Sequence, residues 1–233
     1  MVIGVVLLLV WAQPDFGTIL VIVPISFMMF FIAWANVRYL LLMFAMGVLI
    51  AGSVYLAWDY DKETGKNLNN LWYITQRIDN FLGDSGDAIA NKTINYQTEQ
   101  ALIAIGSWGF AWLGFWQSVQ KFWYLPEVQW DFIFSVIVEE LGFLGGLILV
   151  SMYMYIWYRW LLISRYSSDL FAKYAAFGIT IWILLQAFIN IWVNLNIVPL
   201  TWITLPFISY GWSSLLSLSL WLALLLSISR DMN

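Results

Sequence analysis

Apolar residues occur along this chain in blocks about as long as a bilayer is thick, and polar residues separate the blocks. About 20 apolar residues in an α-helix, rising about 1.5 Å each, cross the roughly 30 Å hydrocarbon core. A block at 2–12 is shorter and would cover only about 18 Å of it, so we expect a partial span there. Full spans are predicted at 16–35, 38–58, 131–158, 174–195 and 206–229.

Basic residues in the short connections predict the orientation of these spans. Arg38 separates two spans, Arg159, Arg165 and Lys173 separate two others, and Arg230 follows the last one. The positive-inside rule puts all of them in the cytoplasm. The outward side then holds 13–18, 59–130 and 196–206.

The long segment 59–130 is predicted to be one large extracytoplasmic loop. Within it, 98–117 is apolar enough to suggest a further span. If that stretch crossed the membrane, the basic connection between the next two spans would move outside. We therefore expect 98–117 to be a re-entrant or interfacial segment, which a membrane protein tolerates where protein or a wet cavity covers the backbone.

Composition supports the membrane assignment and excludes several chemistries. The chain is 62% apolar and only 10% charged, whereas a soluble domain is about a quarter charged. It has no cysteine and no histidine, which excludes a thiol nucleophile, a disulfide framework and imidazole acid–base chemistry. A net charge of −4 argues against nucleic-acid binding. We predict an all-α integral membrane protein, a polytopic helix bundle that forms one membrane domain over 1–233.

Carboxylates at the outer ends of predicted spans are candidate functional groups. Asp15, in QPDFGT, and Asp131, at the start of the longest apolar run, could each be a helix N-cap. However, Glu127, Glu139 and Glu140 lie close to Asp131 in the sequence. Like charge and low dielectric raise the pKa of a carboxyl and suit it to act as a general base. Both roles remain open for Asp131.

Other polar side chains are predicted to lie within the membrane or in the outer loop. Glu139 and Glu140 lie about two turns inside their span, and buried glutamates need partners. On the next span one face carries an amide stripe with a spacing of four residues, which we expect to form hydrogen bonds between helices, with a substrate path as the alternative. The stripe consists of Gln186, Asn190 and Asn194. In the loop, Arg77 and Lys121 could meet an anionic headgroup or could be solvated surface charges.

Four motifs, in this order and spacing, resemble the SEDS glycosyltransferases (FtsW, RodA and SpoVE). They are QPDFGT, AIGSWGF with QSVQKF, YLPEVQWDFIFSVIVEELGFLGG and NIWVNLNIVPLTWITLPFISYGWSS. The match begins near residue 13 and reaches the C-terminus, and QSVQKF favours FtsW and SpoVE over RodA. The chain resembles the C-terminal part of the family, so we expect it to be truncated at its N-terminus relative to them.

The resemblance implies polymerisation of lipid II into glycan strands at the outer face of the bacterial cytoplasmic membrane, in cell division or cell-wall growth. It implies that Asp131, which begins DFIF, is the catalytic residue. A cation must assist the departing pyrophosphate, and either a basic side chain or a carboxylate-bound divalent ion such as Mg²⁺ or Mn²⁺ could do so. No cofactor is otherwise expected. Substrate contacts are expected from Glu127, Lys121, Arg77, Asp15, Gln120, Ser209 and Ser213.

The resemblance also implies a class B penicillin-binding transpeptidase and other divisome proteins as partners, besides membrane lipids. Two other functions remain open. One is a flippase or transporter for the same lipid-linked precursor, because polar residues within spans are equally expected there. The other is a non-catalytic membrane scaffold.

Tryptophan is unusually frequent, with 16 residues against 15 glycines. Many of these tryptophans stand where the resembled family carries glycine, and a bulky indole there would destabilise close helix packing. We predict that the source organism reads UGA codons as glycine; aromatic anchoring at the membrane interface is the alternative and suits Trp58. The glycine-like positions are Trp34, Trp108, Trp112, Trp116, Trp160, Trp192, Trp202 and Trp212.

Overall fold

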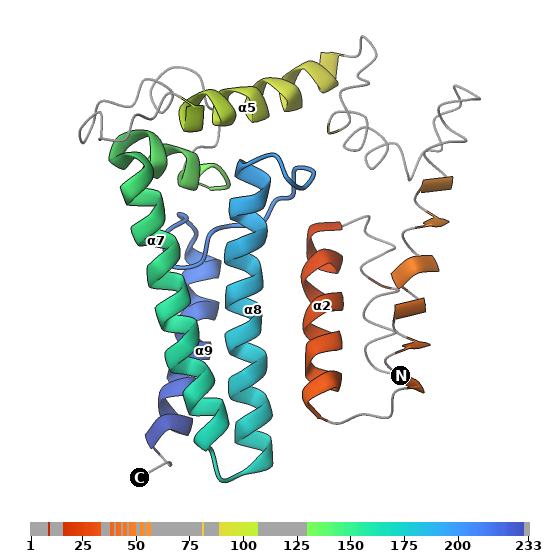
Figure 1. Cartoon of the computed structure of the whole chain (residues 1–233), viewed down its shortest axis with the longest axis vertical. Helices are drawn as coiled ribbons and strands as arrows, with labels where there is room; N and C mark the ends of the chain where they lie inside the picture. Colours follow the sequence, from red (N-terminus) through yellow and green to blue (C-terminus); the bar gives the residue numbers. More distant parts are fainter. Residues whose placement is uncertain are drawn as a thin grey trace. The chain divides into compact units, whose positions relative to one another are not determined.

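The computed structural model describes residues 16–33, 89–106 and 130–230, with short groups of positions between 9 and 81. Within these residues every regular element is an α-helix, which confirms the predicted all-α class (Figure 1). The elements are α2 (Phe16–Ile32), α5 (Ile89–Gly106), α7 (Ile133–Tyr166), α8 (Leu170–Asn194) and α9 (Trp212–Arg230).

Three helices, α7, α8 and α9, are long and apolar enough to cross a membrane. Together with the composition they make the chain a membrane protein. α2 is apolar but shorter, and α5 is not in the spanning group. The part of the predicted re-entrant stretch that is described, 98–106, belongs to α5, and 107–117 lies outside the described residues. The predicted spans at 2–12 and 38–58 are described only at isolated positions.

The helix ends differ from the ends of the predicted spans. α7 continues past residue 158 to Tyr166, since a helix emerging from the membrane can carry charged residues such as Arg159. α8 begins at Leu170 rather than 174, because the Asp169 side chain caps it by accepting a hydrogen bond from the Ala172 N–H at 2.9 Å.

α9 begins at Trp212 rather than 206. The chain turns through 206–208 first, and Phe207 in this turn has a positive φ of 69°, which a right-handed helix cannot contain. The apolar run at 206–229 therefore contains an irregular part before its helix.

α7 is bent at Gly142, which has φ 68° and ψ −170°. This region of backbone space is open essentially to glycine alone. The bend separates a short first part, which follows Asp131, from the long remainder that ends at Tyr166. The sequence ELGFLGG gives no local sign of it, because glycine is common inside membrane helices.

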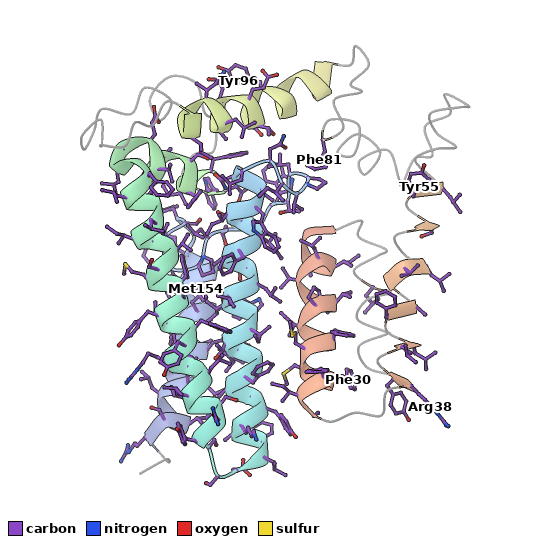
Figure 2. All side chains as sticks on the ribbon, viewed as in Figure 1. Phe30, Arg38, Tyr55, Phe81, Tyr96 and Met154 are labelled. Carbon is purple, nitrogen blue, oxygen red and sulfur yellow. The ribbon has the colours of Figure 1, made fainter. Side chains whose placement is uncertain are left out.

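The chain forms two compact units, Met1–Ile94 with Pro199–Thr201, and Asn95–Val198 with Trp202–Asn233. In the second unit α7 packs along α8, and α9 packs against both (Figure 1). Figure 2 shows side chains crowding the space between α7 and α8. One buried cluster includes Ile105 of α5 and Leu205 besides residues of α7 and α8. A second cluster joins α8 and α9.

Between α8 and α9 the chain runs back along the bundle as an irregular segment, 202–211. Thr204 lies level with Gln186, which is about 12 Å before the end of α8 at 1.5 Å per residue. Irregular backbone at this depth in a membrane protein requires partners for its N–H and C=O groups. The side chains that supply them form the site described next.

The described tryptophans at glycine-like positions fit the structure in different ways. Trp160 is partly buried against the second cluster and its ring lies 6.3 Å from that of Phe207. Trp192, Trp202 and Trp212 are exposed. The other four, Trp34, Trp108, Trp112 and Trp116, lie outside the described residues.

Candidate active site

Asp131 lies in a turn directly before α7 and is buried, with 5% of its surface exposed. Phe132 occupies the N-cap position and makes no side-chain capping bond. The N-cap position thus follows Asp131 by one residue. The side chain that does serve the first turn of α7 comes from another helix.

That side chain is Asn194, at the end of α8. Its Oδ1 accepts hydrogen bonds from the backbone N–H of Ser135 at 3.2 Å and from the Ser135 hydroxyl at 2.6 Å. Its Nδ2 donates to the Asp131 carbonyl oxygen at 2.9 Å and to the Asn190 carbonyl oxygen at 2.9 Å. In a continuous helix the N–H of residue 135 would bond the carbonyl of residue 131. The Asn194 amide is inserted between these two groups.

Asn190, one turn earlier on α8, donates to the same carbonyl. Its Nδ2 lies 2.9 Å from the Asp131 carbonyl oxygen and 2.7 Å from that of Ile203. Gln186 continues the stripe and donates to the Thr204 carbonyl at 3.2 Å. The predicted amide stripe thus bonds to the start of α7 and to the irregular segment 202–211. It satisfies carbonyls that would otherwise be unpaired inside the bundle.

Ser209 forms a hydrogen bond with the backbone of Trp130, the residue before Asp131. Its hydroxyl donates to the Trp130 carbonyl at 2.6 Å and accepts from the Leu205 N–H at 2.7 Å. It is buried and bonds backbone groups through its hydroxyl, and its predicted substrate contact stays a prediction. Ser213 is exposed on the first turn of α9, and the structure gives no contact that assigns it a role.

A tyrosine that the sequence analysis did not single out also anchors the irregular segment. The hydroxyl of Tyr153, buried on α7, donates to the Pro206 carbonyl. A buried tyrosine normally finds a hydrogen-bond partner for its hydroxyl. The sequence does not distinguish it, because α7 also carries Tyr155 and Tyr158, which are exposed.

The two glutamates lie on the short first part of α7, before Gly142. Glu139 is buried and Glu140 is half-buried. Within the residues that the structure describes, no group of three or more carboxylates is arranged to hold a metal ion. The other predicted site residues, Asp15, Arg77, Gln120, Lys121 and Glu127, lie outside the described residues.

The arrangement presents one carboxyl group whose neighbouring peptide groups are both hydrogen-bonded to other elements. The carbonyl before Asp131 bonds Ser209, and the carbonyl after it bonds two amides. A carboxylate held in this way beside a helix N-terminus can accept a proton from a bound hydroxyl or orient a cation.

The chain is similar in sequence to proteins of one known family. All of residues 1–233 match the model of a family described as cell cycle protein, FtsW/RodA/SpoVE. A probable peptidoglycan glycosyltransferase FtsW from Nitrosococcus halophilus is 37% identical over 186 residues, which are 78% of this chain and 44% of the relative. Stage V sporulation protein E of Bacillus subtilis is 35% identical over 183 residues, 78% of this chain and 46% of the relative.

Solved structures give the same picture of the fold. One similar chain comes from a peptidoglycan synthase complex that coordinates polymerization and crosslinking, with a TM-score of 0.67 and 26% sequence identity. The similarity covers 96% of this chain and 58% of that one. The rod shape determining protein RodA of Thermus thermophilus, as an aspartate-to-alanine mutant, has a TM-score of 0.58 at 24% identity and supports the fold alone. The chain spans about half the length of the curated relatives it matches.

Proposed function

Because the chain belongs to the FtsW/RodA/SpoVE family of cell cycle proteins, we propose that it takes part in polymerising lipid II into peptidoglycan glycan strands. The names of its relatives support a peptidoglycan glycosyltransferase. The observation that carries the proposal is the fixed position of Asp131, whose two neighbouring carbonyls bond Ser209 on one side and Asn190 and Asn194 on the other.

In the proposed reaction, Asp131 is the general base. Its carboxylate takes the proton of the acceptor sugar's 4-hydroxyl while that oxygen forms a bond to the anomeric carbon of the donor. The bond from that carbon to the polyprenyl pyrophosphate breaks, and the leaving group keeps the electron pair. A single displacement of this kind inverts the anomeric centre. General-base catalysis typically contributes about 10²–10⁴-fold to the rate.

The negative charge that develops on the pyrophosphate requires a cation. Arg77, Lys121 or a divalent ion such as Mg²⁺ or Mn²⁺ held by carboxylates could supply it. Polymerisation that survives EDTA but is lost in R77Q or K121Q would assign the basic side chains, and loss in EDTA that Mg²⁺ or Mn²⁺ restores would assign the ion. Further substrate contacts are proposed for Asp15, Gln120, Glu127 and Ser213.

We place the protein in the bacterial cytoplasmic membrane as a multi-pass protein with Asp131 on its outer side. Arg165, Lys173 and Arg230 support this orientation, because they lie at or beside the helix ends remote from Asp131. A lipid-linked sugar polymerised outside the cell would then reach Asp131 from the outer leaflet. A class B penicillin-binding transpeptidase and divisome proteins are the proposed partners, in division or in maintaining cell shape.

The test is chain extension by the native gene product reconstituted in liposomes with lipid II. We expect glycan polymer, measured by gel electrophoresis of labelled product. A flippase would move the headgroup across the liposome membrane without forming polymer, and a scaffold would do neither. Either of those results would contradict the proposal.

A further inference from the structure

The backbone at Asp131 is fixed on both sides of its Cα atom. The peptide group before it is held through the Trp130 carbonyl, which accepts from Ser209 at 2.6 Å. The peptide group after it is held through the Asp131 carbonyl, which accepts from Asn190 and Asn194, each at 2.9 Å. Peptide groups are planar, and only φ and ψ join them at a Cα. Fixing both planes therefore fixes φ and ψ of Asp131.

These contacts differ from ordinary helix capping. A carbonyl oxygen has two lone pairs, and the Asp131 carbonyl uses both on side-chain amides from α8. The Ser135 N–H, which would compete for that oxygen in a continuous helix, bonds Asn194 Oδ1 instead. Asp131 therefore lies in a turn outside the helix, and the first backbone bond of α7 runs from the Val136 N–H to the Phe132 carbonyl at 3.4 Å.

The groups that fix Asp131 are themselves fixed. Asn190 and Asn194 are almost fully buried, at 1% and 0% exposure. Asn190 also bonds the Ile203 carbonyl, and the Ser209 hydroxyl also accepts from Leu205, so α8 and the segment 202–211 are joined to one another as well as to Asp131. The Cα atom from which the carboxylate extends is therefore fixed by these contacts.

We propose that Asn190, Asn194 and Ser209 are positioning residues for the reaction, acting through the two peptide groups beside Asp131. This inference rests on the proposed function, in which Asp131 is the base. None of the three touches the reacting atoms in this account. Loss of one of them is expected to shift the carboxylate, and a misplacement of about 1 Å can lower a rate by about 10²-fold.

The test measures lipid II polymerisation by the reconstituted native gene product carrying N190L or S209A. We expect kcat to fall about 10- to 100-fold while KM for lipid II changes less than about twofold, because binding is not removed. S209T keeps the hydroxyl and should recover most of the rate. T180V is the matched control: Thr180 is equally buried on α8, but among the described residues its hydroxyl bonds only the Ala176 carbonyl of its own helix.

A second measurement separates positioning from a general loss of structure. D131E keeps a carboxylate but displaces it from the reactive position. Removing a residue that only positions this carboxylate should then have little further effect on kcat. We expect N190L to lower kcat by less than about threefold in the D131E background, since residues that act through one group are not additive. If N190L does not accumulate, S209A against S209T carries the same comparison.

The inference is overturned if N190L and S209A leave kcat unchanged, or if each lowers kcat by the same factor in both backgrounds. It is also overturned if KM rises while kcat stays constant. Failure of the proposed function itself looks different: the wild-type protein would form no polymer, or D131N would be fully active.

Discussion

Removing the Asn194 side chain should destabilise the protein by about 2–3 kcal/mol. In N194L four hydrogen bonds of 3.2 Å or shorter disappear, two with Ser135 and one each with the Asp131 and Asn190 carbonyls. Hydrogen bonds between side chains in membrane proteins average about 0.6 kcal/mol, and four of them amount to about 2.4 kcal/mol.

The cost of leaving the Ser135 N–H without its partner gives a similar free energy. Ser135 is fully buried, and its hydroxyl can turn to the carbonyl four residues earlier, as serines in helices do. Its backbone N–H loses its acceptor, Asn194 Oδ1, in N194L. A buried donor without a partner costs about 1–3 kcal/mol. The Asp131 carbonyl retains Asn190.

The assay is reversible unfolding in mixed detergent micelles, followed by circular dichroism. T180V is again the control and should cost less than about 1 kcal/mol, since its hydroxyl bonds a carbonyl that the helix already pairs. N194D should be worse than N194L, because it keeps the shape, loses the donors and sets a negative charge against two carbonyl oxygens. An N194L protein within about 0.5 kcal/mol of wild type would show that the inserted amide does not stabilise the start of α7.

Two further predictions concern particular residues. G142A should destabilise the protein by about 1–3 kcal/mol, because alanine rarely adopts the φ of 68° found there. The control is G106A, which should change the unfolding free energy little because an added Cβ meets no atom within 4 Å. Equal effects of the two substitutions on the unfolding free energy would contradict the bend assigned to Gly142. Mass spectrometry of the native protein should find glycine at Trp192, Trp202 and Trp212; tryptophan at all three would remove the codon hypothesis.

The helices themselves follow from the sequence, and their ends do so only in part. Apolar runs of bilayer length predicted α7 and α8, but a run ends where charge begins, while the α7 helix continues to Tyr166. The apolar run at 206–229 was predicted as one span, but its first residues are irregular. Pro206 and Gly211 are of the types that commonly interrupt helices. Gly142 gave no warning, because one glycine in a membrane helix does not specify its φ.

The candidate site was predictable as a set of residues but not as a set of contacts. The spacing of the amides on α8 indicated a buried polar face, and the motif drew attention to Asp131. Asn190 and Asn194 are 59 and 63 positions away from Asp131 in the sequence. No local sequence pattern specifies hydrogen bonds over such a separation. The sequence also gave no sign that the Ser209 hydroxyl, expected to contact substrate, bonds the carbonyl of residue 130. Because that contact uses backbone, it does not depend on which side chain position 130 carries.

The role of Asp131 as the base is decided by the polymerisation rate of D131N on lipid II. Asparagine preserves the size of the side chain and the backbone that Asn190, Asn194 and Ser209 hold, but it cannot accept the proton. We predict a loss of kcat of about 10²–10⁴-fold with an unchanged unfolding free energy and normal membrane insertion. Polymerisation by D131N at the wild-type rate would contradict the assignment of Asp131 as the base.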